Sequence, residues 1–221
     1  MNTEKRDFDK EAASWDEHPS RVKLANDVVR AISNHIVMTS DMDVMDFGCG
    51  TGLLTIQLQP LVNSIIGIDS SQGMLDIFRM KIAQQNLTNV KALFLDLDKG
   101  DVLTGHYHLV VCNMTLHHIN EIRPLFEQFY KVTAPGGYLC IADLDSDAGQ
   151  FHGSNTGVCH FGFDRATLRK IFIEAGFDEV HAITAAEVVK PTVNGEMGQF
   201  TVFLMSGRKR SHKEQRTFLK K

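Results

Sequence analysis

The sequence lacks the features that direct a chain into a membrane or into the secretory route. No apolar run in its 221 residues approaches the roughly 20 residues that a membrane-spanning helix needs. Residues 1–7 are polar, and no apolar segment follows them, so we expect no secretory signal. We therefore expect a cytoplasmic protein with no membrane partner.

Cysteine and positive charge are both scarce. The four cysteines show no C-x-x-C spacing, which predicts reduced thiols rather than disulfides. The formal net charge is −4, so no overall positive field attracts nucleic acid, and we expect no nucleic-acid partner. The hydrophobic content of 43% is enough for one well-packed domain. We expect that domain to span residues 1–207, with residues 208–221 as a basic, mobile tail.

A glycine-rich stretch after a buried strand organises the chain. An apolar run ends in Asp46, and Gly48, Gly50 and Gly52 follow at alternating positions. Glycine permits left-handed backbone angles and close approach of a ligand, and the helix expected next offers unpaired N–H groups. The third glycine comes one residue earlier than in the dinucleotide pattern, which favours a ligand without a pyrophosphate. A structural glycine turn without a ligand is the alternative.

Hydrophobic runs alternate with helical patterns along the middle of the chain, which predicts a parallel sheet with right-handed crossovers. The helix and strand periodicities distinguish the two kinds of element. We expect strands over 43–47, 64–68, 90–95, 107–112, 138–142, 179–189 and 199–206, and helices over 52–58, 72–85, 121–132 and 165–175.

An acid stands at the end of the second strand. Asp69 lies 17 residues after Gly52, where an open α/β fold places a carboxylate against ribose hydroxyls. A carboxylate can accept from both hydroxyls. The alternative role of Asp69 is to cap the helix that begins near Ser71, and the two roles are compatible.

The stretch D-F-G-C-G-T-G resembles motif I of the class I S-adenosylmethionine-dependent methyltransferases, and the chain is similar to the small ubiquinone/menaquinone-biosynthesis-type members. The segment H-L-V-V-C-N-M-T-L-H-H-I and the later Pro-Gly-Gly turn extend the resemblance over about 42–207. It implies a Rossmann-like seven-stranded, mostly parallel sheet with helices on both faces and a C-terminal antiparallel hairpin. It also implies S-adenosylmethionine as the cofactor and methyl transfer to a small-molecule acceptor.

The resemblance assigns roles at the strand ends. An acid after the third strand takes the adenine amino group, and the loop after the fourth strand borders the reactive methyl. Two alternatives to these roles remain. The acids after the third strand can form a surface cluster, and Met74 can pack in the core. The expected cofactor-binding residues are Asp46, Gly48, Cys49, Gly50, Gly52, Asp69, Ser70, Met74, Asp96, Leu97, Asn113, Met114 and His117.

Two other regions point to the acceptor. Residues 1–42 carry two helical patterns, either a lid over the cofactor or a cover for the sheet edge. Residues 145–163 form a long irregular segment after the fifth strand, with too many apolar residues for simple disorder, and we expect it to line the acceptor pocket. From this segment His152 and His160 are the expected catalytic bases, because neutral imidazole accepts a proton near pH 7.

Two more histidines, 117 and 118, are also candidate bases, but a backbone hydrogen bond at a helix entrance is the better interpretation of His118. We expect no metal, because no fourth ligand accompanies His152, Cys159 and His160. A non-catalytic cofactor-binding protein and, less favoured, an NAD-dependent oxidoreductase are the alternatives to a methyltransferase. The sequence does not indicate an oligomeric state.

Overall fold

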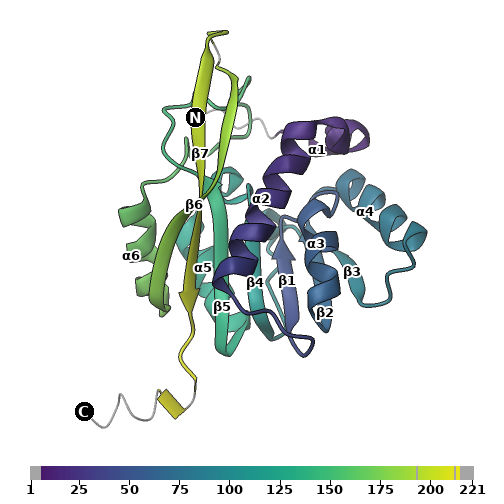
Figure 1. Ribbon diagram of the computed structural model, residues 1–221, viewed down its shortest axis with the longest axis vertical. Helices are drawn as coiled ribbons and strands as arrows, with labels where there is room; N and C mark the ends of the chain where they lie inside the picture. Colours follow the sequence, from purple (N-terminus) through teal and green to yellow (C-terminus); the bar gives the residue numbers. More distant parts are fainter. Residues whose placement is uncertain (1–5, 193, 212, 215–221) are drawn as a thin grey trace.

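A single seven-stranded sheet forms the centre of the computed structural model, which describes residues 6–192, 194–211 and 213–214 (Figure 1). The strand order is β3-β2-β1-β4-β5-β7-β6. Strands β1 to β5 run parallel, and β7 is antiparallel to both β5 and β6, as predicted. The strands are β1 (Asp43–Phe47), β2 (Ser64–Asp69), β3 (Val90–Phe94), β4 (Tyr107–Asn113), β5 (Thr133–Leu144), β6 (Asp178–Pro191) and β7 (Met197–Arg208).

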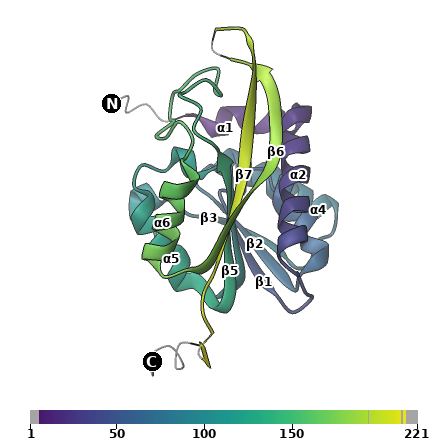
Figure 2. The same cartoon turned by 60° about the vertical axis from the view of Figure 1, so that its left-hand side comes forward.

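Helices cover both faces of the sheet (Figure 2). Two of them, α5 and α6, lie on one face, and α2, α3 and α4 lie on the other. The short α1 and a following 3-10 turn, η1 (Ala12–Glu17), precede them. The helices are α1 (Phe8–Glu11), α2 (Pro19–His35), α3 (Leu53–Leu58), α4 (Gln72–Gln84), α5 (Ile122–Val132) and α6 (Arg165–Ala175).

The central strands alternate their side chains between two buried layers. Val44 packs with α2 to α4, whereas the next residue, Met45, packs with α5 and α6. Strand β4 repeats this pattern, with Val110 on the α5 side and Val111 on the other. Because both faces are covered, apolar residues occupy consecutive positions in the middle of these strands, as is usual for a parallel sheet.

The helix ends follow from local sequence signals. Ser71 caps α4 by accepting from the N–H of Met74, and Asp164 caps α6 by accepting from the N–H of Thr167. Gly176 ends α6 with a left-handed φ of 109°. Pro19 occupies the first turn of α2, where a missing N–H costs nothing.

The hairpin of β6 and β7 is longer than predicted. The predicted strands covered 179–189 and 199–206, whereas β6 reaches Pro191 and β7 begins at Met197. Its tip extends beyond the sheet at the end where α1 also lies (Figure 1). The extension pairs strand with strand as far as Pro191 and Met197, so the backbone groups that the two strands turn toward each other are satisfied without a third strand.

The Pro-Gly-Gly segment differs from the predicted turn, because β5 already begins at Thr133. Its backbone pairs with the chain after β7: the N–H of Gly136 donates to the carbonyl of Lys209, and the N–H of Lys209 donates to Gly137. Lys209 Nζ also donates to the carbonyls of Tyr130 and Thr133. The start of the expected mobile tail is therefore anchored at the sheet; residues 212 and 215–221 of that tail lie outside the described residues.

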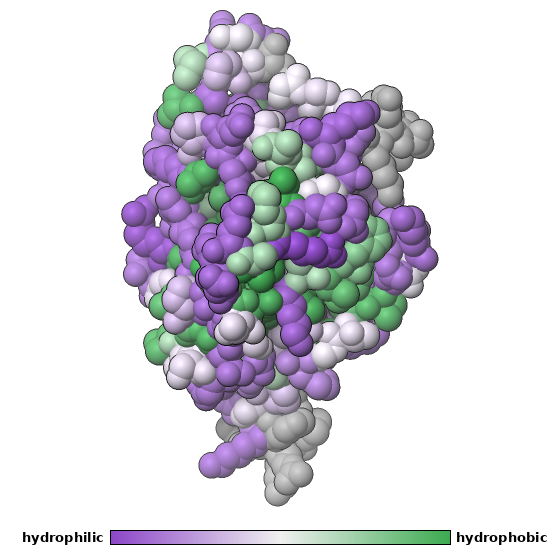
Figure 3. Space-filling view, turned by 90° about the vertical axis from the view of Figure 1, so that its right-hand side faces the viewer, coloured by the Kyte–Doolittle hydropathy of each residue, from purple (hydrophilic) through white to green (hydrophobic). Residues whose placement is uncertain are grey.

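At the opposite edge, β3 leaves apolar side chains exposed. Figure 3 shows the corresponding side of the molecule, where hydrophobic groups lie between polar ones. The exposed apolar residues near this edge include Met80, Leu93, Phe94 and Val102. None of the described helices has the length and apolar character needed to cross a bilayer.

Candidate active site

The glycine turn between β1 and α3 combines tight packing with one open position. Gly48, Gly50 and Gly52 have φ values of 72°, 54° and 81°. A Cβ at Gly48 would lie 2.1 Å from Thr115 Oγ1, and one at Gly52 would lie 2.2 Å from the Phe78 ring. A Cβ at Gly50 would meet only Met74 Sδ, at 4.0 Å. The outer glycines are therefore required by packing, and Gly50 leaves room for a ligand against the backbone.

Asp69 lies at the end of β2 and faces this turn. Its Oδ2 accepts from the N–H of Gly50 at 2.8 Å, and its Oδ1 accepts from the N–H of Ser71 at 2.8 Å. Burial raises the pKa of Asp69, although these N–H groups stabilise the charged form. Each oxygen can accept a second hydrogen bond. The carboxylate thus fixes the loop and keeps acceptor capacity for two hydroxyl groups.

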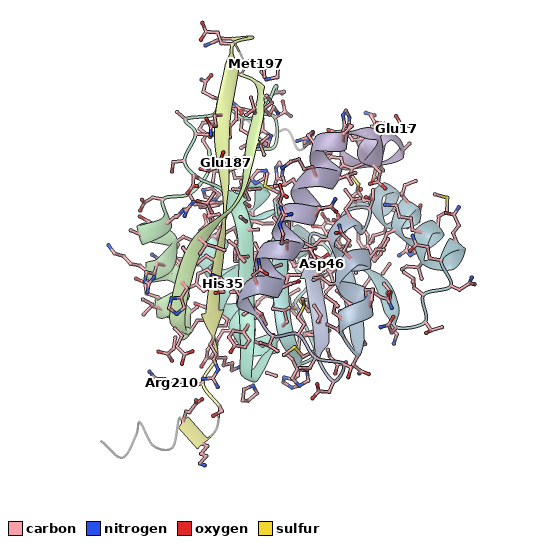
Figure 4. All side chains as sticks on the ribbon, viewed as in Figure 1. Glu17, His35, Asp46, Glu187, Met197 and Arg210 are labelled. Carbon is pink, nitrogen blue, oxygen red and sulfur yellow. The ribbon has the colours of Figure 1, made fainter. Side chains whose placement is uncertain are left out.

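Asp46 is buried at the end of β1, near the centre of the molecule (Figure 4). Its Oδ2 accepts from Thr55 Oγ1 at 2.5 Å. Burial raises the pKa of Asp46 to about 7; the Thr55 hydrogen bond opposes the shift and the charge of Asp69 adds to it. Burial also raises the pKa of the Cys49 thiol. Both side chains lie behind the turn and support it.

Asp96 follows β3, and its oxygens face its own loop. The Oδ1 accepts from the N–H of Asp98 at 3.1 Å, and Lys99 Nζ lies 3.4 Å from Oδ2. The Asp96 side chain is 14% exposed, which leaves it less accessible than that of a solvated surface acid. Leu97, which follows it, begins a 3-10 turn. This strand end contributes a carboxylate that keeps part of its hydrogen-bond acceptor capacity, at the same end of the sheet as Asp69.

The loop after β4 returns to the glycine turn. Thr115 Oγ1 donates toward the carbonyl of Gly48 at 3.2 Å, and Met114 has a positive φ of 54°. Asn113 Oδ1 is buried and has no hydrogen-bond partner among the described residues. A buried amide oxygen without a donor is costly, so this atom is suited to accept from a bound molecule.

A buried imidazole–carboxylate pair lies at the ends of β4 and β5. His117 Nδ1 is 2.7 Å from Asp143 Oδ1, and both side chains are 1% exposed. The backbone N–H of His117 also donates to Asp143, at 3.3 Å. Because Nδ1 faces a carboxylate, it carries the proton, which leaves a lone pair on Nε2. That Nε2 is buried and has no partner within the described part of the chain.

The rings of His118 and His152 lie close to the ring of His117, whereas the His160 ring has a different partner. The His152 ring lies 5.0 Å from that of His117, and its buried Nε2 is likewise unpartnered in the described residues. The His118 ring is 4.1 Å from His117, but its Nδ1 binds the carbonyl of Gly157 at 2.7 Å. His160 Nε2 lies 2.9 Å from the carbonyl of Ile119, so that nitrogen already has a partner.

His118 and His152 are held in their neutral forms. Burial lowers the pKa of His152 to about 3, and the nearby positive groups add to the shift. Burial also lowers the pKa of His118 to about 4, with His117 contributing. At neutral pH both imidazoles therefore carry a lone pair rather than a charge.

Residues 6–17 lie over the cofactor end of the sheet. Asp9 Oδ1 accepts from Ser71 Oγ at 2.5 Å and from the N–H of Gly73 at 2.8 Å. Asp16 accepts from Thr51 Oγ1 at 2.5 Å and forms an ion pair with Lys81. The helix α2 that follows packs on the sheet face. The N-terminal region therefore contacts the loops at this end of the sheet through residues 6–17 and packs on one face of the sheet through α2.

The structure brings most of the predicted site residues to one end of the sheet. The glycines, the strand-end acids and the loop after β4 lie there together. Ser70 is exposed, whereas Met74 is only 2% exposed and packs in the interior behind Gly50. The His160 ring lies against Phe163, while its backbone N–H donates to the carbonyl of His117 at 3.1 Å. Sequence reasoning missed Asp143, although the ends of adjacent parallel strands must meet.

Comparisons with known proteins identify the family. Residues 44–137 match the family described as methyltransferase domain. The chain is 28% identical over 200 residues to an uncharacterized methyltransferase of Schizosaccharomyces pombe, covering 77% of this chain and 70% of that protein. The family match and this relative support a class I S-adenosylmethionine-dependent methyltransferase. The cofactor of this family is S-adenosylmethionine, as the glycine turn and its resemblance predicted.

Two further comparisons are more distant. A ubiquinone biosynthesis O-methyltransferase of Acinetobacter baylyi is 20% identical over 143 residues, covering 62% of this methyltransferase and 60% of that protein. The structure resembles phosphoethanolamine N-methyltransferase 2 of Haemonchus contortus, solved with S-adenosyl-L-methionine, with a TM-score of 0.68 and 13% identity over 92% of this chain and 60% of that one. The matched segments span 44 to 70% of the curated relatives.

The site has room and chemistry for this cofactor. The space before Gly50 admits a ligand at the main chain, and Asp69 retains acceptor capacity for the ribose hydroxyls. Asn113 Oδ1 adds an acceptor that the described residues leave unsatisfied. The residues present therefore fit the predicted ligand.

Proposed function

We propose that this methyltransferase transfers a methyl group from S-adenosylmethionine to a small-molecule acceptor. The observation that carries the proposal is the pair of buried, unpartnered nitrogens, Nε2 of His117 and of His152, beside the glycine turn. Residues 6–17 contact the turn, and residues 149–161 hold His152 and contact His117 through backbone hydrogen bonds. Buried polar atoms that need a partner suit a small acceptor, which can reach them, better than a macromolecule.

The cofactor contacts follow from the strand ends. Asp69 would accept from the ribose hydroxyls, and Asp96 with Leu97 would hold the adenine. The backbone at Gly50 and the loop at Asn113 and Met114 would surround the amino-acid part and the methyl. When bound, S-adenosylmethionine supplies a methyl group already activated on a sulfonium, so the protein mainly aligns the acceptor and removes its proton.

We assign the proton acceptor to His117, supported by His152. Asp143 holds the proton on Nδ1 of His117, so that the buried, unpartnered Nε2 of the neutral ring keeps a lone pair. His152, which we predicted as a base, lies across from it with a lowered pKa. His160 has its Nε2 bound to a main-chain carbonyl and is the weaker candidate. The three thiols at positions 49, 112 and 140 are free and buried, in keeping with a cytoplasmic site of action.

Calorimetric titration tests the cofactor and the ribose acid together. We expect micromolar binding of S-adenosylmethionine and S-adenosylhomocysteine, about −8 kcal/mol, and no comparable binding of NAD. Asp69→Ala should weaken the binding by at least about tenfold, because two hydroxyl contacts and the Gly50 anchor are lost. Asp76→Ala is the matched control, since this exposed acid on α4 pairs only with surface partners.

The acceptor is then sought by following formation of S-adenosylhomocysteine with a panel of small hydroxyl, amine and thiol compounds. Turnover on a panel member that requires His117 supports the proposal. Binding of NAD in preference to S-adenosylmethionine would contradict the methyltransferase function. Tight cofactor binding with no turnover on a broad panel would favour a non-catalytic binding protein.

A further inference from the structure

Three positively charged side chains from distant parts of the sequence meet beside the predicted acceptor space. Arg6 precedes α1, Arg21 is in the first turns of α2, and Lys190 is near the end of β6. We call them the cationic cluster. They come together because the extended hairpin rises on the same side as α1 (Figure 1), and Figure 4 labels Glu187 on the same strand as Lys190. Both arginines affect Lys190 electrostatically, and their charges help to lower its pKa.

Aromatic rings fix the positions of these cations. The Arg21 guanidinium lies 3.6 Å from the centroid of the Trp15 ring, and Arg6 lies 5.8 Å from the same ring. Lys190 Nζ lies 4.4 Å from the centroid of Phe151. A cation over a ring face is held without using its hydrogen-bond donors. Arg6 donates two of its N–H groups to Glu11, at 2.6 and 2.7 Å, and Arg21 donates to the carbonyl of Trp15 at 3.4 Å. The other guanidinium N–H groups and the Lys190 ammonium are the donors suited to a ligand.

The carboxylates near the cluster do not balance its charge. Glu11 is shared between the two arginines, at 2.6 Å from Arg6 and 3.5 Å from Arg21. Asp16 also acts on Arg21, but it is paired with Lys81. Within the described ranges, no carboxylate forms an ion pair with Lys190. Positive charge is thus in excess where three segments meet, although the whole chain carries a net charge of −4.

The cluster adjoins the histidines through two contacts. Phe151, which lies under Lys190, has its ring 5.0 Å from that of His152. On the other side, a Cβ at Gly157 would lie 2.5 Å from the backbone nitrogen of Arg6, so the N-terminal segment and the loop after β5 are in direct contact. An occupant of the space beside His152 therefore lies under the influence of these cations, which also help to lower the pKa of His152.

We propose that the cationic cluster binds an anionic group, a carboxylate or a phosphate, of the methyl acceptor. The inference rests on the proposed function and specifies its substrate class. Guanidinium and ammonium groups form charge-assisted hydrogen bonds with such anions, and partial burial strengthens them. With the anion at the cluster, the rest of the acceptor extends along Phe151 and His152 toward His117.

Direct binding tests the inference without knowledge of the acceptor. Inorganic phosphate and malonate are titrated into the protein saturated with S-adenosylhomocysteine, at low ionic strength, and propanediol serves as the uncharged counterpart of malonate. We expect saturable binding of one or both anions and none of the diol. Lys190→Gln should weaken anion binding by about fivefold or more, because one direct charge is lost.

The controls separate a built site from general charge. Lys131→Gln removes a positive charge from the exposed side of α5 and should leave the anion affinity unchanged. Arg21→Lys keeps the charge but removes the planar stacking on Trp15, and it should weaken the affinity less than Lys190→Gln. The nuclear magnetic resonance signals of the Phe151 and His152 rings should shift with the added anion in the wild-type protein.

Several outcomes would overturn the inference. They are the absence of saturable binding for either anion, equal losses in Lys190→Gln and Lys131→Gln, or equal binding of the diol. A protein that fails to bind S-adenosylhomocysteine contradicts the proposed function instead, and the anion titration is then read on the unliganded protein. The two failures are therefore distinguishable.

Discussion

The two ends of the ligand site are built in different ways. The cofactor end, at β1 and β2, uses backbone groups and satisfied side chains: Gly50 donates to Asp69, and Thr55 donates to Asp46. The acceptor end contains buried atoms that the described residues leave without partners, on His117 and His152. The cofactor can be held by a fixed loop. The acceptor, by contrast, must supply hydrogen-bond partners for the polar atoms that face it.

The difference also concerns distance along the chain. Most of the cofactor end is formed by segments that follow one another closely between residues 43 and 99, and the loop at Asn113 and Met114 completes it. The acceptor end joins Arg6, Trp15, His117, Phe151 and Lys190. Changes at the cofactor end should therefore alter cofactor affinity and stability together, and changes at the acceptor end should alter turnover alone. The following predictions test this division in order of decreasing effect.

The largest effect is expected at His117. His117→Gln keeps a donor toward Asp143 but removes the lone pair that accepts the proton, so turnover should fall by about 10²- to 10⁴-fold. Affinity for S-adenosylhomocysteine should stay within about twofold, because we place Nε2 on the acceptor side. Initial rates with an identified acceptor and calorimetry provide the two measurements. His35→Gln, at the far end of α2 in Figure 4, is the control.

If His117→Gln also lost cofactor affinity, His117 would serve both ends of the site. That result would contradict the division into a cofactor end and an acceptor end. Asp143→Asn sharpens the same test, because the amide no longer fixes the proton on Nδ1. Its turnover should fall at pH 7 while the fold, followed by circular dichroism, stays native.

The next effect is expected at the glycine turn. Gly48→Ala places a Cβ 2.1 Å from Thr115 Oγ1 at a positive φ of 72°, so we expect a loss of about 3 kcal/mol in unfolding free energy, with no cofactor binding. Urea denaturation and calorimetry measure the two losses. Gly153→Ala is the matched control, because no atom lies within 4 Å of its Cβ and its φ is not positive. Normal cofactor affinity in Gly48→Ala would show that the turn is not rigid.

Asp46 predicts a pH dependence of stability. Its pKa in the folded protein is about 7, above the ordinary 3.8, so folding favours the protonated carboxyl. This contribution is complete below about pH 4 and is lost as the pH rises through 7. Between pH 5 and 8 the wild type should therefore lose on the order of 3 kcal/mol more unfolding free energy than Asp46→Asn. Parallel pH curves for the two proteins would contradict the shift.

The smallest effect is expected at the N-terminal contact. Asp9→Ala removes the acceptor of Ser71 Oγ and of the Gly73 N–H, and should cost about 1 kcal/mol. Proteolysis of residues 6–17 should become faster in this variant, and the addition of cofactor should slow it less than in the wild type. Asp7→Ala, which removes an exposed cap of α1, is the comparison.

The sequence predicts the cofactor end well because its determinants are local. The glycine spacing, the acid at Asp69 and the caps at Ser71 and Asp164 each follow from a few neighbouring residues, and all lie where expected. The strand order follows from the alternation of runs and the handedness of crossovers. Element bounds differ most at β5, where pairing with Lys209 extends the strand through the predicted turn.

The acceptor end escapes prediction because its contacts join segments that are far apart. His117 lies in the turn after β4, and Asp143 lies near the end of the adjacent parallel strand β5, so their meeting was deducible once β4 and β5 were placed side by side. No pattern in the sequence places Lys190 over Phe151 or Arg6 against Gly157. Those contacts depend on how far the hairpin extends and how the irregular loop folds back.

The attachment of residues 6–17 has a consequence for the rate of turnover. The segment is held at the site by hydrogen bonds that Asp9 and Asp16 accept from residues in and beside the cofactor turn. Each is worth about 1–3 kcal/mol, so the whole attachment can open and close within the microsecond-to-millisecond range of lid motions. Release of the spent cofactor must then wait for this opening. The steady-state rate of a good substrate would respond to solvent viscosity, while a single turnover of bound reactants would not.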